Sequence, residues 1–181
     1  MGTGGGGCGG TAVAGTVQTT LNVSGQTFPK GQALQQWLGN VNALGQGGVP
    51  ATDLSIFQPR FNSVVSSTNI PSQPWINSQN MGSNQTMYFS FDTPVNLMPP
   101  STGPDPSGGP TYCGRAVFSD LHVAGDPSTC GDNTNSPPPG GCIQADLSPQ
   151  EKALEFMLFD LSSCVIPDTV APPTTIPPTP Q

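Results

Sequence analysis

The sequence has little charge. Lys, Arg, Asp and Glu make up 8% of its 181 residues, whereas about a quarter is usual. Only four residues are Lys or Arg, and the net charge is −7. Because nucleic acids and anionic membrane surfaces are bound by clustered Lys and Arg, we expect neither as a partner. The sequence also lacks an apolar run of the about 18 residues that a membrane span needs, so we expect no membrane insertion.

Leader and metal-site motifs are also missing. The residues after Met1 are mostly glycine, without the basic and apolar regions of a signal peptide. With one histidine and no CxxC spacing, no zinc set is expected, and we expect no cofactor. Asn, Gln, Ser and Thr are abundant and Lys is nearly absent. This composition favours an extracellular or cell-surface location, in a chain that belongs to a larger protein.

Glycine and proline are abundant, with 23 and 22 residues. Residues 1–15 are mostly small and cannot bury enough apolar area to offset the entropy of ordering. We expect a flexible Gly-rich segment over 1–15, one α/β domain over 16–165, and a Pro/Thr-rich linker tail over 166–181. Long Gly/Pro-rich loops are expected at 99–110 and 126–142.

Two segments predict helices. One begins at Pro29, a favourable first position, and continues with apolar residues at helical spacing to about Val41. The other has the pattern of a capping box, with Ser148 before the first turn and Glu151 three residues later, and should end near Ser162. Its predicted buried face consists of Leu154, Met157, Leu158 and Leu161, with Phe156 and Phe159 beside it.

Four regions favour strands. Residues 16–23 alternate loosely, 49–66 contain two short strands or turns around Pro59, and 115–122 form the most apolar strand. The segment 86–91 alternates more clearly. Its predicted faces are Met87, Phe89 and Phe91 on one side and Thr86, Tyr88 and Ser90 on the other.

The cysteines predict disulfide staples in the last third of the chain. The four that follow Cys8 allow three pairings. We favour Cys130–Cys142, across a Gly/Pro-rich loop, and Cys113–Cys164, between a strand start and a helix end. Cys8 is then left over.

Four residues are candidates for a site. His122 is either a catalytic base at a strand end or a structural residue bonded to the loop below it, and we favour the structural interpretation because a single histidine lacks a paired nucleophile. Asp120 alternates with His122 and could bind a polar ligand. Arg115 could do the same, but an ion pair within the fold is favoured. Trp75, which follows Pro74 in a polar segment, is the better candidate for a surface platform that stacks on a glycan, because Trp37 lies on an apolar helix face.

The block GRAVFSDLHV resembles the GRVxYTxxH strand of the ThuA-like branch of the class I glutamine amidotransferase-like superfamily. TMYFSFDTPV before it and SPQEKALEFMLFDL after it are similar to the family's flanking strand and closing helix. The resemblance covers roughly residues 16–165. It also extends to the C-terminal half of a domain found in large bacterial secreted or cell-surface proteins. It implies a small parallel or mixed sheet with two main helices, a partial flavodoxin-like fold.

The resemblance also implies a hydrolase that uses His122. The sequence departs from the family in two places, because Ala124 stands where the family has a glutamate and MGTGGGG cannot form the strand before a nucleophile elbow at Cys8. We therefore expect a non-catalytic domain of a bacterial surface protein. Its function would be binding, adhesion or assembly, including self-association into filaments or a surface layer.

Overall fold

A computed structural model of the chain describes residues 12–57, 59–69, 71–93, 95, 114–121, 123, 146–162, 165 and 168. His122, the predicted disulfide residues Cys113, Cys130, Cys142 and Cys164, and Cys8 lie outside the described residues. The helices and strands, in chain order, are β1 (Val13–Val17), α1 (Pro29–Asn40), β2 (Asp53–Ile56), β3 (Ser72–Asn80), β4 (Ser83–Thr93), β5 (Gly114–Ser119) and α2 (Pro149–Ser162).

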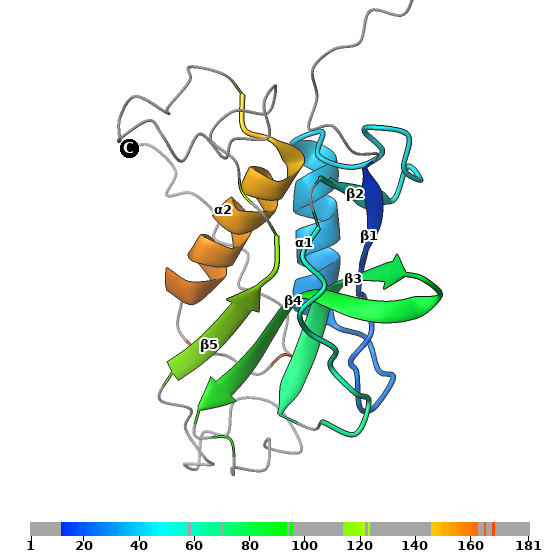
Figure 1. Ribbon diagram of the computed structural model, residues 1–181. Coiled ribbons are helices and arrows are strands. Elements are labelled where there is room, and N and C mark those ends of the chain that lie inside the picture. The colour runs from blue at the N-terminus through cyan, green and yellow to red at the C-terminus, as the bar shows by residue number, and fades with distance from the viewer. Residues whose placement is uncertain are drawn as a thin grey trace, which may run out of the picture.

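The strands form one five-stranded sheet in the order β2-β1-β3-β4-β5, and all four neighbouring pairs are antiparallel. The α/β class and the two helices, which lie side by side against the curled sheet (Figure 1), agree with the prediction. The predicted parallel or mixed, flavodoxin-like sheet is wrong. Parallel neighbours require long crossover connections, whereas β3 and β4 are successive strands joined by a tight hairpin.

The hairpin between β3 and β4 was not predicted. Asn80 pairs with Ser83, which leaves Met81 and Gly82 as a two-residue turn. Both have positive φ, 49° and 82°, as a type I′ turn requires. Strand β3 itself contains Pro74 and has register shifts on either side of Ile76. A proline inside a strand is tolerated at a bulge of this kind.

The core lies between the sheet and the helices. The more polar set predicted for β4 faces the core: Thr86, Tyr88 and Ser90 are at most 1% exposed. The predicted separation of the two faces holds only in part, because Met87 of the other set is 0% exposed and belongs to the core. The opposite face carries Phe89, which stacks on Phe118 of β5 at 5.2 Å between ring centroids. The buried apolar residues include Phe28, Leu34, Leu38, Leu54, Ile56, Trp75, Ile76 and Met157.

The buried face of α2 differs from the predicted one. Met157 is buried, but Leu158 and Leu161 are 56% and 40% exposed. Polar contacts set this rotation. Gln150 accepts a hydrogen bond from the amide of Phe57 at 2.9 Å and donates to its carbonyl at 3.1 Å, and Asp160 near the other end forms buried ion pairs. Both contacts turn the side of α2 that carries Gln150 and Asp160 toward the sheet.

The N-terminus of α2 has the predicted capping box. The amide of Ser148 donates to Glu151 Oε2 at 2.7 Å, and the amide of Glu151 donates to Ser148 Oγ at 3.2 Å. We expect Ser148→Ala to lower the free energy of unfolding by about 1 kcal/mol, because it leaves a helix N–H group unsatisfied. Urea unfolding measures the change. Glu155→Ala in the same helix is the control, and an equal loss in both variants would contradict a specific capping effect.

Candidate functional site

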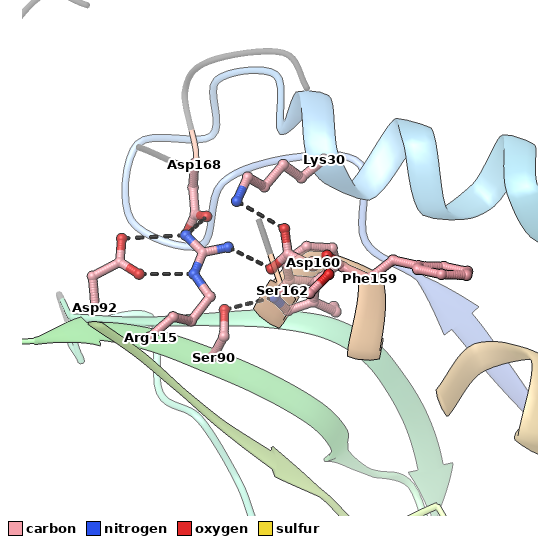
Figure 2. A network of polar contacts seen from close by, with 9 residues as sticks. Lys30, Ser90, Asp92, Arg115, Phe159, Asp160, Ser162 and Asp168 are labelled. Atoms are coloured by element: carbon pink, nitrogen blue, oxygen red, sulfur yellow. Dashed lines mark hydrogen bonds and ion pairs between the residues drawn. The ribbon is translucent and has the colours of Figure 1, made fainter. Parts of the chain in front are cut away.

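The most concentrated polar group in the described structure is a cluster around Arg115, which lies in β5 (Figure 2). The guanidinium binds Asp92 of β4 through both carboxylate oxygens, at 2.8 and 3.2 Å. It also donates to Asp160 of α2 at 2.8 Å and to Asp168 at 2.7 Å. The Arg115 side chain is only 3% exposed. Its predicted pairing with carboxylates of the fold is confirmed.

Lys30 is the second cation of the cluster. Its ammonium lies 2.9 Å from Asp160 Oδ1, and the side chain is 2% exposed. A cation in the first turn of a helix is unfavourable, because the helix dipole is positive there; the paired carboxylate offsets this effect. Asp160 therefore joins α1 and β5 through its two oxygens. We call Lys30, Asp92, Arg115, Asp160 and Asp168 the Arg115 cluster.

The pKa values of Arg115, Asp168 and the neighbouring Tyr88 are shifted. Burial lowers the pKa of Arg115, but the hydrogen bond with Asp92 and the charges of the three aspartates outweigh it, so the net pKa is raised. Burial raises the pKa of Asp168; the charge of Arg115 opposes this rise and that of Asp92 adds to it. Burial also raises the pKa of Tyr88, with a further contribution from Asp160. At neutral pH, Arg115 is a fixed cation and Tyr88 is a neutral phenol.

Asp120 is bound within the domain. It follows the last residue of β5, since that strand ends at Ser119 rather than at 122 as predicted. Its Oδ2 accepts from the Asn62 amide at 2.8 Å and its Oδ1 from Asn62 Nδ2 at 2.9 Å. The residue is 6% exposed. Both oxygens therefore fasten the segment 59–69 to the end of β5.

The expectation that Trp75 is a surface residue is wrong. It lies in β3 and is 0% exposed. Its ring stacks on Tyr88 at 5.2 Å and meets Phe28 edge-on at 4.8 Å, and its Nε1 donates to Ser90 Oγ at 2.8 Å. Trp75 is thus a central core residue with its polar atom satisfied, and it cannot serve as a platform for a sugar.

Across the described ranges, no group of three or more His, Cys, Asp or Glu side chains could hold a metal ion. No described helix is long and apolar enough to cross a membrane. The catalytic candidate His122 lies outside these ranges. Of the four predicted site residues, Arg115 is the one that the structure places in a cluster of charged side chains.

Sequence reasoning missed the carboxylates of the cluster. Asp160 is the only charged residue in FMLFDLS, an otherwise apolar stretch of helix, and Lys30 follows the helix-starting Pro29. A charge in an apolar stretch is a signal for a buried partner, because an unpaired buried charge is costly. With four basic residues in the chain, the number of available partners was small. Nothing in the local sequence marks Asp92 or Asp168.

Comparisons of this chain with protein-family models, curated proteins and solved structures found no significant match.

Proposed function

We propose that the chain is a non-catalytic, extracytoplasmic domain of a bacterial surface protein that acts in assembly, by pairing the outer edge of β5 with the same strand of a second copy. The observation that carries this proposal is an edge strand without an outward-facing charge. The composition described above supports the extracytoplasmic location.

Strand β5 is the last strand on its side of the sheet. It pairs with β4, and no other described strand pairs with its outer edge. The amide of Asp120 donates to the Met87 carbonyl at 2.8 Å, and hydrogen-bonded residues alternate along an antiparallel pair. The backbone groups of Val117 and Ser119 therefore point away from β4, where they can pair with another strand.

Among the described residues, β5 carries no proline, no bulge and no outward-facing charge. Natural edge strands carry outward charges, prolines or bulges. The one charged residue of β5 is Arg115, and its side chain is directed into the cluster. Phe118, on the opposite face from Arg115, is 37% exposed and with Phe89 forms an apolar outer surface. Both features favour association with a second strand.

The other candidate residues support a non-catalytic role. Arg115, Asp120 and Trp75 all bind neighbouring elements of the domain through buried contacts. A catalytic or ligand-binding group needs an atom directed toward a substrate. These three side chains direct their polar atoms toward the domain itself.

A lysine at the edge should prevent the association. We expect the wild-type chain to sediment faster as its concentration rises, and Phe118→Lys to remain monomeric, because it places a charge on the outer face of the edge strand. Met81→Lys is the matched control, since Met81 is 100% exposed at the distant hairpin turn. Sedimentation velocity measures both. A wild-type chain that stays monomeric, or a Phe118→Lys variant that associates equally, would contradict the proposal.

The hydrolase alternative and the resemblance to the ThuA-like family remain predictions. The alternative depends on His122 and on a nucleophile outside this chain, and no contact of the described residues favours it.

A further inference from the structure

The Arg115 cluster has more acidic than basic groups. Three aspartates meet one arginine and one lysine. The chain has four Lys and Arg residues in total, and in the described ranges the other two form no ion pair with these aspartates: Lys152 binds Asp146 and the Val41 carbonyl, and Arg60 is exposed. The five side chains are between 2% and 20% exposed, so water screens the excess negative charge poorly.

The three carboxylates are not equally compensated. Asp92 has two hydrogen bonds from Arg115, and Asp160 binds both Lys30 and Arg115. Asp168 has a single ion pair, to the Arg115 Nη2 atom that Asp92 also uses. A proton that binds Asp168 therefore weakens fewer charged contacts than a proton that binds Asp92 or Asp160.

We propose that the Arg115 cluster is a proton-binding site, in which folding adds one proton to Asp168, so that mild acid stabilises the domain. The groups that face this site are Lys30 from α1, Asp92 and Tyr88 from β4, Arg115 from β5 and Asp160 from α2. The bound proton cancels the excess charge without breaking the ion pairs of Asp92 and Asp160. The cluster thus makes the stability of the domain sensitive to pH.

The sign of the effect follows from proton linkage. An aspartate in the unfolded chain has a pKa of about 3.9, and the burial of Asp168 raises its pKa in the folded state. Between these two pKa values the folded state binds more protons than the unfolded state. The free energy of unfolding therefore falls as the pH rises through this window. For one proton, the folding equilibrium constant changes by up to about tenfold per pH unit there.

The test is urea unfolding from about pH 4, near the pKa of an unfolded aspartate, to neutral pH. We expect the stability of the wild type to fall with rising pH, and Asp168→Asn to remove much of that fall. Asp146→Asn is the control with the same change of net charge. Asp146 is 85% exposed and bound to Lys152, whose hydrogen bond and charge lower its pKa, so removing it should not flatten the profile.

An Asp168→Asn profile that matches the wild type would overturn the proposal. If that variant does not fold, carboxyl carbon NMR titration of the wild-type chain decides. A pKa of Asp168 above about 3.9, the value of an unfolded aspartate, supports the proton site, and a pKa at or below that value overturns it.

Discussion

Replacing Arg115 by methionine is expected to lower the free energy of unfolding by about 3–5 kcal/mol, the cost of removing one partner from a buried ion pair. Methionine keeps much of the side-chain length but removes the guanidinium that pairs with Asp92, Asp160 and Asp168. Natural domains have a total stability of about 5–15 kcal/mol. The loss is therefore a large fraction of the total, and urea unfolding monitored by circular dichroism would measure it.

Arg60→Met is the matched control for Arg115→Met. It makes the same chemical change at an exposed arginine, where a substitution usually changes stability by less than about 0.5 kcal/mol. If both variants lose equally little, the Arg115 cluster does not stabilise the fold. That result would contradict the structural role assigned to Arg115.

Replacing Trp75 by alanine should cost a similar amount, about 3–5 kcal/mol, because it removes a large side chain from a close-packed core. The ring contacts Phe28, Tyr88 and Phe156, so its loss opens a cavity between the sheet and both helices. Differential scanning calorimetry would show the loss as a lower unfolding temperature.

Trp75→Phe separates packing from hydrogen bonding. Phenylalanine fills part of the site but leaves Ser90 Oγ without the hydrogen bond from Trp75 Nε1, a loss of about 1–3 kcal/mol and smaller than that of Trp75→Ala. A Trp75→Ala variant that unfolds like the wild type, but no longer binds a glycan, would contradict the core assignment and restore the surface interpretation.

Local signals predicted both helices. Pro29 begins α1, and the pair Ser148 and Glu151 forms the capping box of α2. These features depend on residues within one helical turn of each other, so the start of each helix can be predicted from the local sequence. The buried face of α2 could not be predicted in the same way, because contacts with Phe57, Lys30 and Arg115 turn the helix. These partners are distant in the sequence.

The sheet was harder to predict. The segment that forms β3 contains Pro74, a residue that argues against a central strand, and its alternation is interrupted by the bulges at Ile76. The Met-Gly turn that follows is less distinctive than Asn-Gly. Because neither β3 nor its hairpin is predicted, the strand predicted at 86–91 has no predicted partner. The antiparallel strand order therefore cannot be derived from the sequence. The resemblance to a flavodoxin-like family then suggested a sheet that the structure does not have.

The candidate site was predicted in part. The pairing of Arg115 with carboxylates followed from the rule that buried charges are paired, but its partners lie in separate elements and could not be identified. The position of Asp120 beside the apolar strand marks it as a candidate, but its partner Asn62 is 58 residues away in the sequence and cannot be identified from it. The polar neighbours of Trp75 suggest a surface loop. In the structure these neighbours belong to the central strand β3 and pair with residues of β4.

Amide hydrogen exchange of β5 at low and high protein concentration tests assembly through this edge strand. The amides of Val117 and Ser119 should exchange more slowly as the concentration rises, because they point away from β4 and pair with a second copy. The amide of Met81 in the hairpin turn should show no such change. Exchange at Val117 and Ser119 that does not depend on concentration would contradict assembly through this edge, and with it the proposed function.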